Sequence, residues 1–587
     1  MKRLILTTTI IALVLCIAGC EDFLDTTNYK KKDSSNFPIS QTDAEQMVTG
    51  IYADMISVVE KNVEQLPFFV AYLASDETFG GGSTSNIIAQ AFDRMLATKI
   101  DEFGKIWEVC YSGIFRANSA LESIPNIDEG EWKSTADRDH LMGQAHFLRA
   151  FYYWQLADLF ETVPLVLKSE PVNLPRASAD EIFGQIASDL LEAIRLMNNQ
   201  KYGEFEKGRT SKWTAQAYLA RIFMFYTGFY KKDSMPTADG GSVTKQQVIE
   251  NLNDCIANSG YSLVPDPRNI WPYANQYTKW HYKFSIDNDL NWTGNGDQET
   301  MWNIRFNYFA GSQKHNRVPE FFGLRYQSGG TGRRESFPYG QGYTNGTVNT
   351  RMVEEWAGDP NYGEADKRLW GSVLDTKAEL PDHQGDATKE VERTWYHGKK
   401  YIVVTCFASP DANPAKDSPY NNYSYIITEQ QNHNQYGNRD DLIYMRFADV
   451  LLMHSELTGT VDGINKVRAR AGLSPIAGYS FEALQKERKF ELAFEGIRWN
   501  DLRRWYPDTA GDIIEAAQKD VPTQYRAQKN VPYQWHQGNG FAKRYKETRG
   551  FWRIPDTQIN LSNGVLEQSP GWEDDKSWMF ATLPYKF

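Results

Sequence analysis

Residues 140–160 read HLMGQAHFLRAFYYWQLADLF, and this stretch decides the fold of the chain. Leu141, Ala145, Leu148, Tyr152 and Leu159 recur every three or four positions, which places them on one face of a helix. A proline follows a few residues later, and proline does not continue a helix. The pattern predicts a long helix that packs one face against neighbouring helices and ends by Pro164.

The helical pattern extends on both sides of this stretch, from about residue 40 to 260. Residues 210–230 repeat it, with Ala215, Ala217 and Ala220 among aromatic residues, as closely packed helical hairpins require. Four predicted helix starts carry a hydroxyl residue followed three positions later by a carboxylate or amide, which is the signature of a capping box. These pairs are Thr42 with Glu45, Ser134 with Asp137, Ser178 with Glu181, and Thr244 with Gln247. We therefore expect an N-terminal helical region over residues 40–260.

The pattern changes near residue 260, where prolines at 265, 267 and 272 open an aromatic and glycine-rich segment. We expect an irregular insert over residues 261–440, with short strands at 401–407 and 423–430. Helical periodicity returns at 443–457, 464–473 and 481–505, which defines a C-terminal helical region over 441–587. The predicted fold class is therefore mainly α, with a long irregular insert. Irregular segments of such length inside a compact protein usually carry function.

The first residues have the layout of a secretory signal peptide. Lys2 and Arg3 precede an apolar run, and Ile17-Ala18-Gly19-Cys20 resembles the bacterial lipobox, in which the cysteine is acylated and becomes the first residue. We expect a signal peptide over 1–19, lipidation of Cys20 and a tether over 20–39. No later run of about 18 apolar residues predicts a membrane span.

Composition narrows the function classes. The chain has 587 residues, of which 24% are charged and 41% hydrophobic, and this is the composition of a large globular protein. Its net charge of −12 disfavours binding to nucleic-acid phosphates. Beyond the leader and Cys20, only Cys110, Cys255 and Cys406 remain, so at most one disulfide can form. Aromatic residues make up 14% of the chain, more than a core alone requires, and we expect some of them to face a ligand.

Three carboxylates lie one turn apart in ERKFELAFEGIRWNDLRRW, residues 487–505. Glu487, Glu491 and Glu495 could form the acid and nucleophile pair of a glycoside hydrolase. A general acid needs a raised pKa, whereas Arg488, Arg498, Arg503 and Arg504 crowd the segment and favour the ionised forms. We expect a buried ion-pair network that ties this helix to the core.

Six motifs in order along the chain resemble successive signatures of the SusD/RagB family. They are Cys20 with EDFLD (21–25), LRAFYYWQLADLFETVPLVL (148–167), RFADVLLMHSE (446–456), INKVRARAGL (464–473), ELAFEGIRWNDLRRW (491–505) and FWRIPDTQINLSNGVLEQSPGW (551–572). The resemblance implies a scaffold of tetratricopeptide-like helical hairpins and a lipoprotein on the cell surface of Bacteroidetes. It also implies capture of glycans or peptides, without catalysis, and their release into a SusC/RagA-type TonB-dependent outer-membrane transporter.

Residues 271–303 hold the aromatic residues that we expect at a glycan site. Sugar rings pack C–H groups on aromatic faces while amides and charges read the hydroxyls, so exposed rings among polar residues favour glycan binding. The candidate ligand-binding residues are Tyr273, Trp280, Tyr282 and Trp292, whereas Trp302 fits a buried strand. A second candidate is the loop at 72–86, where the resemblance implies polar contacts and where Asp76 and Glu77 precede three glycines.

Two functional alternatives stay open: a peptide or glycopeptide receptor of the same family, and a glycoside hydrolase using Glu491 and Glu495 or a carboxylate pair in the insert. We expect no cofactor and no catalytic metal. Asp287, Asp289 and Asn291 imitate the opening of a calcium loop, but the required glycine and glutamate are missing, which leaves open only a non-canonical structural calcium site.

Overall fold

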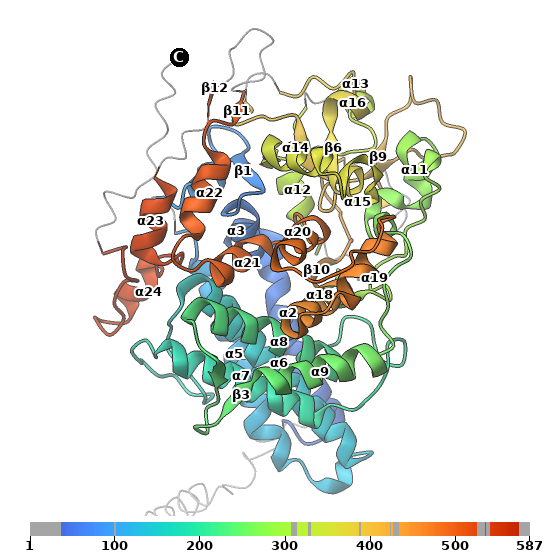
Figure 1. Cartoon of the computed structure of the whole chain (residues 1–587). Helices are drawn as coiled ribbons and strands as arrows, with labels where there is room; N and C mark the ends of the chain where they lie inside the picture. Colours follow the sequence, from blue (N-terminus) through green and yellow to red (C-terminus); the bar gives the residue numbers. More distant parts are fainter. Residues whose placement is uncertain are drawn as a thin grey trace, which may run out of the picture.

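The N-terminal part of the protein is an array of helices packed in chain order. The computed structural model describes residues 37–98, 101–306, 314–326, 330–386, 389–422, 424–425, 434–524, 534–535 and 540–573. Its long N-terminal helices are α2 (Gln41–Lys61), α5 (Gly104–Ser123), α6 (Thr135–Phe160), α7 (Ala179–Leu196), α8 (Lys212–Tyr230) and α9 (Lys245–Asn258). Helix α2 packs on α5, and each later helix of the series packs on the next, as tetratricopeptide-like hairpins do. These helices form the lower half of the molecule in Figure 1.

Helix α6 lies at the centre of this array and is more deeply buried than its sequence pattern predicts. Every residue from Phe147 to Phe160 is buried, not one face alone. An apolar surface on all sides of a helix is typical of a helix that neighbours surround. The helix ends at Phe160, where Glu161 adopts a φ of 64°, so that Pro164 lies beyond its end.

Helix capping follows the predicted residues at three of the four starts. The side chains of Ser134, Ser178 and Thr244 cap α6, α7 and α9, and complete capping boxes form at the last two. The fourth prediction, Thr42 with Glu45, is wrong, because Ser40 caps α2 and accepts from the backbone N–H of Asp43. Both candidates are hydroxyl residues followed three positions later by an acid, so the pattern alone did not separate them.

The region after residue 260 contains many short elements in place of the loop that its composition predicts. Its helices are η5 (Pro267–Ile270), η6 (Pro272–Ala274), α10 (Gln276–Lys279), α11 (Lys283–Asp287), α12 (Val318–Phe322), α13 (Gly330–Glu335), α14 (Thr350–Gly358), η7 (Gly363–Ala365), α15 (Lys367–Ser372) and α16 (Thr376–Glu379). An antiparallel sheet has the order β1 (Thr78–Gly81), β5 (Asn345–Val348), β7 (Tyr396–Gly398) and β6 (Val373–Asp375). This sheet joins a strand from the N-terminal region to three strands from the insert.

Two of the expected strands in the insert have different outcomes. Within 401–407, only β8 (Thr405–Cys406) is a strand, and it pairs with β9 (Tyr420–Asn421). Most of 423–430 lies outside the described residues. The expected buried strand at Trp302 is confirmed: β4 (Thr300–Ile304) pairs with β10 (Leu442–Arg446), and Met445 lies opposite Trp302.

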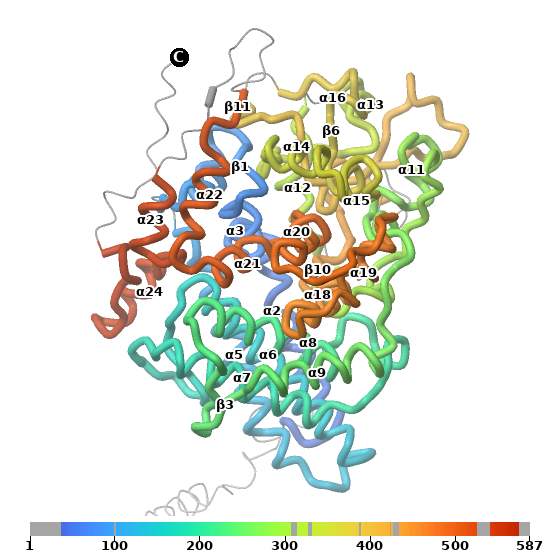
Figure 2. Tube along the Cα trace, in the orientation of Figure 1, coloured from blue at the N-terminus to red at the C-terminus, as the bar shows by residue number. Residues whose placement is uncertain are grey.

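The C-terminal helices pack across the N-terminal array and the insert (Figure 2). They are α18 (Phe447–Thr458), α19 (Asp462–Arg470), α20 (Phe481–Glu491), α21 (Arg498–Trp505), α22 (Ala510–Gln518), α23 (Phe541–Thr548) and α24 (Asp556–Leu561). The predicted helix at 443–457 begins as strand β10. The predicted helix at 481–505 is broken between α20 and α21, where Phe494 and Gly496 have φ values of 63° and 69°. Helix α21 then packs on α8 and on α3 (Pro67–Leu73).

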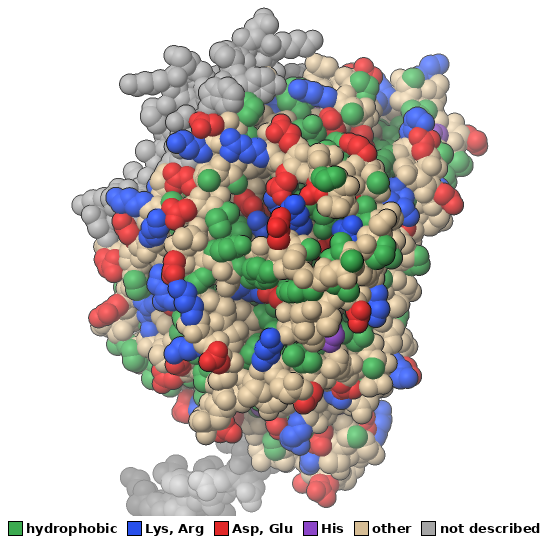
Figure 3. Space-filling view, viewed as in Figure 1, with side chains coloured by type: hydrophobic (Ala, Val, Ile, Leu, Met, Phe, Trp, Pro, Cys, Tyr) green, Lys and Arg blue, Asp and Glu red, His purple; other side chains and the backbone are tan. Residues whose placement is uncertain are grey.

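Smaller elements complete the described part of the chain. They are η2 (Val63–Gln65), α4 (Ile87–Phe92), η3 (Ile124–Asn126), η4 (Glu129–Glu131) and the strand pairs β2 (Ser234–Pro236) with β3 (Ser242–Thr244), and β11 (Pro522–Thr523) with β12 (Gln534–Trp535). Cys110, Cys255 and Cys406 are buried free thiols. Among the described residues, no helix is long and apolar enough to cross a membrane. On the face shown in Figure 3, acidic and basic side chains are interspersed.

Candidate functional site

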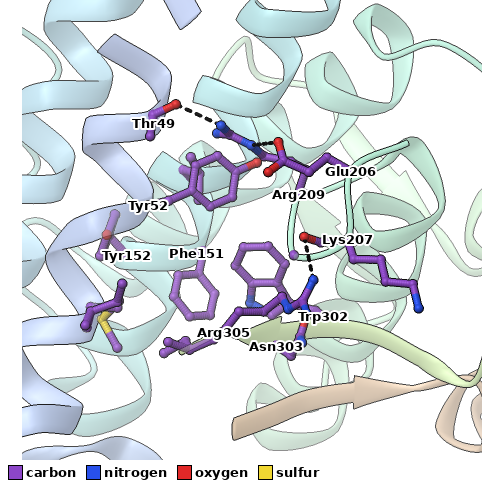
Figure 4. A pocket seen from close by; sticks show the side chains of 15 residues that line it. Thr49, Tyr52, Phe151, Tyr152, Glu206, Lys207, Arg209, Trp302, Asn303 and Arg305 are labelled. Carbon is purple, nitrogen blue, oxygen red and sulfur yellow. Dashed lines mark hydrogen bonds and ion pairs between the residues drawn. The ribbon is translucent and has the colours of Figure 1, made fainter. Parts of the chain in front are cut away.

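A cavity of about 230 Å³ opens between helices α2 and α6, the loop that leads into α8, and strand β4. We call it the α2–β4 pocket (Figure 4). Its aromatic lining comes from Tyr52, Phe151, Tyr152 and Trp302, and its polar lining from Thr49, Glu206, Lys207, Arg209, Asn303 and Arg305. The pocket therefore joins segments from residue 49 to residue 305 that helix packing and the β4–β10 pairing bring together.

Trp302 is a buried member of the aromatic wall. It points from β4 towards α6, where its ring meets Phe147 and Phe151 edge to face at centroid distances of 5.0 and 5.5 Å. Its centroid lies 6.0 Å from that of Tyr52. The indole Nε1 is buried and donates no hydrogen bond to any described residue. This N–H has almost no solvent-accessible surface, so a ligand in the pocket contacts other atoms of the indole, and leaving the donor unpaired costs free energy.

Arg209 and Tyr52 form the upper rim of the pocket in Figure 4. The guanidinium of Arg209 lies 4.8 Å from the centroid of the Tyr52 ring. It donates to Thr49 Oγ1 at 2.8 Å and to Glu206 Oε2 at 3.1 Å. Tyr52 donates through its hydroxyl to Gln144 Oε1 at 2.7 Å, and burial raises the pKa of this phenol. These contacts fix the orientation of both side chains before any ligand binds.

Arg305 follows β4 and forms the opposite rim. Its Nη1 donates to the carbonyl of Lys207 at 3.2 Å, and its Nε lies 3.6 Å from Asp441 Oδ1. Asp441 also accepts from Asn303 Nδ2. Burial raises the pKa of Asp441 to about 7, although Arg305 and the Asn303 hydrogen bond act in the opposite direction. Gly208 has a φ of 88°, and a Cβ there would lie 2.5 Å from Arg305 Cδ, so glycine makes room for this arginine.

The aromatic residues predicted at the site lie elsewhere. Tyr273 and Tyr282 are buried, with their hydroxyls bonded to the Gly371 carbonyl and to Glu379, so the prediction of exposed rings is wrong for both. Short helices of the insert fold over these rings and bury them in the core. Trp280 and Trp292 are half-buried, and Trp292 Nε1 donates to the Ile270 carbonyl at 3.1 Å. Neither of these two tryptophans lines the α2–β4 pocket.

Asp76 and Glu77 do not form an exposed polar loop, so that prediction is also wrong. Arg498 from α21 donates to both oxygens of Asp76 at 2.8 Å, and Glu77 accepts from the backbone N–H of Phe494 at 3.2 Å. Both carboxyl groups are buried. Burial and the neighbouring Asp76 raise the pKa of Glu77 to about 8. The C-terminal region covers this segment. The sequence alone does not show that Arg498 pairs with Asp76, because the two residues meet only in the folded chain.

The expected buried ion-pair network at Glu487, Glu491 and Glu495 is confirmed, but its cations come from other segments than predicted. The three glutamates pair with Arg368, Lys400, Arg446, Arg468 and Arg470. The four arginines near these glutamates in sequence have other partners. Arg488 pairs with Asp449 and Asp501, Arg498 with Asp76, Arg503 with Asp158, and Arg504 with Glu456 and Asp501. Burial alone raises the pKa of Glu491, but Arg470, Arg446 and Arg368 outweigh it and hold that pKa well below its ordinary value.

The residues that imitate a calcium loop pair with lysines. Asp289 accepts from Lys279 Nζ at 2.6 Å, and Asp287 accepts from Lys283 Nζ at 2.6 Å. In the part of the chain that the structure describes, no group of three or more His, Cys, Asp or Glu residues is placed to hold a metal ion.

The fold and the pocket define a class: a mainly helical protein of tetratricopeptide-like hairpins with a cavity between its helical array and strand β4. A family model described as starch-binding and associating with the outer membrane matches residues 22–224, and a SusD family model matches residues 298–572. The chain belongs to the SusD/RagB family.

Known relatives resemble the chain over most of its length. A SusD-like protein of Formosa agariphila is 25% identical, covering 84% of this chain and 88% of its own. Two solved structures share the fold. A laminarin-binding SusD-like protein has a TM-score of 0.63 at 21% identity, over 91% of this chain and 99% of its own. Surface glycan-binding protein A from Bacteroides thetaiotaomicron, solved with laminarihexaose, has a TM-score of 0.64 at 17% identity, over 90% and 99% of the two chains.

Sequence reasoning missed the residues that line the α2–β4 pocket. Tyr52 and Arg209 lie in segments with ordinary helix and turn patterns, and Trp302 was predicted only as core. One local signal was available, because Lys207, Gly208 and Arg209 place two cations around a glycine between two predicted helices. Such a turn can bring charged side chains to a surface.

Proposed function

We propose that this protein is a non-catalytic, cell-surface glycan-binding lipoprotein that delivers oligosaccharides to a TonB-dependent outer-membrane transporter. The observation that carries the proposal is the α2–β4 pocket, in which aromatic rings stand beside guanidinium and amide donors. Ring faces accept the C–H groups of a sugar, and fixed donors read its hydroxyls. The cavity volume of about 230 Å³ lies below the range of about 300–1,000 Å³ usual for drug-sized ligands, which suits one sugar ring of a longer chain.

Family membership supports the ligand class and the location. Two structural relatives carry laminarin or laminarihexaose in their names, and a matched family model is described as associating with the outer membrane. Cys20 lies outside the described residues and remains our proposed site of lipid attachment. A SusC/RagA-like transporter is the partner that the family resemblance implies.

The carboxylates considered for catalysis support binding without cleavage. Glu491 and Glu495 are buried in ion pairs with Arg446, and Glu495 also pairs with Lys400 at 2.6 Å. A general acid needs a pKa near the working pH, and the pKa of Glu491 is displaced in the other direction. Both carboxylates are therefore buried away from a substrate, and Glu491 also lacks a proton to donate.

Isothermal titration against a panel of oligosaccharides tests the proposal. We expect at least one glycan to bind and no reducing ends to be released on incubation. Binding of peptides in place of every glycan, or release of reducing sugar, would overturn it. Trp280→Ala and Trp292→Ala test the aromatic residues that the sequence predicts. Both variants should keep the glycan affinity of the wild type if the ligand occupies the α2–β4 pocket alone.

A matched pair of variants on α2 tests the pocket itself. Thr49 is exposed at the rim, and Thr49→Phe fills the mouth without removing a core side chain. We expect it to weaken glycan binding by about tenfold or more, equivalent to about 1.4 kcal/mol. Glu45 lies one turn earlier, is exposed and does not line the pocket, so Glu45→Phe adds the same ring and should leave affinity unchanged. Equal effects of both variants would place the glycan elsewhere.

A further inference from the structure

We propose that the α2–β4 pocket selects an acidic sugar, one that carries a carboxylate or a sulfate ester, over a neutral one. The inference rests on the proposed function, because it names the class of glycan that the same pocket takes. Its basis is the charge of the rim, where Lys207, Arg209 and Arg305 line the pocket with the carboxylate of Glu206, and Asp441 lies next to Arg305 outside the lining, in a chain whose net charge is −12.

The single carboxylate of the rim is already bound. Glu206 pairs with Arg209 Nε at 3.1 Å, and the two charges cancel locally. The ammonium of Lys207 lies 5.9 Å from the centroid of the Tyr202 ring, which is outside the pocket lining. Among the described residues, no carboxylate forms an ion pair with it. Its side chain extends away from the aromatic residues of the pocket in Figure 4, and its flexible four-carbon stem lets the ammonium turn back towards an anion bound there.

Arg305 provides a directed anion-binding group in the pocket lining. Of its five N–H donors, one makes the hydrogen bond to the Lys207 carbonyl, and the ion pair with Asp441 is 3.6 Å long, beyond hydrogen-bond distance. The guanidinium fork matches the paired oxygens of a carboxylate or sulfate and can bind them with two parallel hydrogen bonds. Burial raises the pKa of Asp441 to about 7, so this carboxyl offsets the arginine charge less firmly than an ordinary aspartate does.

The uncharged part of the pocket orients the same sugar. The rings of Tyr52 and Trp302 lie next to one another in the lining, with centroids 6.0 Å apart, and offer apolar surface to the C–H groups of a sugar. A neutral sugar would meet these rings but would leave Lys207 without an anion and Arg305 with only its 3.6 Å pair to Asp441. An acidic sugar satisfies both sets of groups, which is why the rim favours it.

Titration calorimetry with three tetrasaccharides tests the inference: tetragalacturonate, sulfated neocarratetraose and neutral galactotetraose. We expect one or both acidic probes to bind about tenfold more tightly than the neutral probe at low salt. The uronate and sulfate arms identify which anion is recognised. About 0.5 M sodium chloride should reduce the preference, because exposed charges are screened over a few ångströms at that ionic strength.

Variants of the two cations connect the preference to the pocket. Lys207→Gln together with Arg305→Gln should remove most of the tenfold ratio. Lys201→Gln changes the same charge in the same loop outside the pocket lining and should leave the ratio intact. Melting curves confirm that each variant is folded.

The outcomes separate this inference from the proposed function. Equal affinity for all three probes, or an acidic preference that survives the double variant, overturns the acidic selectivity and leaves glycan binding standing. If none of the three tetrasaccharides binds but another, neutral glycan of the panel does, the acidic selectivity is likewise overturned and glycan binding still stands. Failure of the whole panel overturns both.

Discussion

Arg446 at the end of β10 is the side chain whose loss tests the structural reasoning most directly. It donates to Glu299 at 2.5 Å, to Glu491 at 2.9 Å and to Glu495 at 2.7 Å, and its side chain is 2% exposed. These carboxylates come from the segment before β4, from the end of α20 and from the following turn. We predict that Arg446→Met strongly lowers the free energy of unfolding.

The magnitude follows from the charges of the network. Its cations are Arg368, Lys400, Arg446, Arg468 and Arg470, and its carboxylates are Asp366, Glu299, Glu487, Glu491 and Glu495. Five positive charges thus face five negative charges in the core, and Arg446→Met leaves one negative charge in excess. Breaking a buried pair in this way costs about 3–5 kcal/mol. Arg446→Lys keeps the charge but loses the fork, and should cost about 1–3 kcal/mol.

Urea unfolding followed by circular dichroism measures the effect, and an exposed pair provides the control. Arg195 is 65% exposed and pairs with Glu192 three residues earlier on α7. Arg195→Met should change the free energy of unfolding by about 1 kcal/mol or less, since exposed ion pairs contribute little. If Arg446→Met and Arg195→Met differ by less than about 1 kcal/mol, the buried network does not hold β10 and β4 in place, and the reasoning is refuted.

Three further predictions concern other parts of the chain. Glu77 holds its proton up to about pH 8 in the folded state but releases it near pH 4.5 when unfolded, so its contribution to stability is present below pH 4.5 and is lost as the pH rises to 8. The side chain introduced by Glu77→Gln cannot ionise. Between pH 5 and 7 the free energy of unfolding of the wild type should therefore fall by about 2–3 kcal/mol more than that of the variant. Parallel curves of unfolding free energy against pH for the two proteins would contradict the raised pKa. Gly208→Ala displaces Arg305 and strains a φ of 88°, so glycan affinity in calorimetry should fall, and unchanged affinity would remove Arg305 from the site. Cys20→Ser should move the protein from the membrane pellet to the soluble fraction, and retention in the pellet would exclude lipid anchoring.

The sequence predicts the helical array well because its signals are local. Caps at Ser134, Ser178 and Thr244 depend on side chains within three residues of the helix start, and the structure has them as predicted. Errors appear where contacts distant in sequence decide the local structure. Residues 442–446 have helical periodicity but pair with β4, and this pairing makes them a strand.

Charge partners show the same limit. The composition of 487–505 predicts a buried network, since carboxylates on an apolar helix need cations. It does not predict which cations, because Arg368, Lys400 and Arg446 lie between 45 and 123 residues earlier in the chain than their glutamates and reach them only after folding. Asp76 illustrates the longest such reach, with Arg498 lying 422 residues away. The local sequence thus shows that buried carboxylates need cationic partners, but it does not show which residues provide them.

The α2–β4 pocket depends on the same long-range contacts as the network. Trp302 reaches the pocket because β4 pairs with β10, and β10 is held by Arg446 among three buried carboxylates. The aromatic residues of the insert looked suited to a ligand because their composition was polar and irregular, yet Tyr273 and Tyr282 serve as core for its short helices. Composition therefore identifies rings that need a polar partner, whereas only the pairing of distant strands decides which ring faces a cavity. The ion-pair network and the α2–β4 pocket are connected through the β4–β10 strand pair, so a substitution that removes Arg446 should also weaken glycan binding if the glycan occupies this pocket.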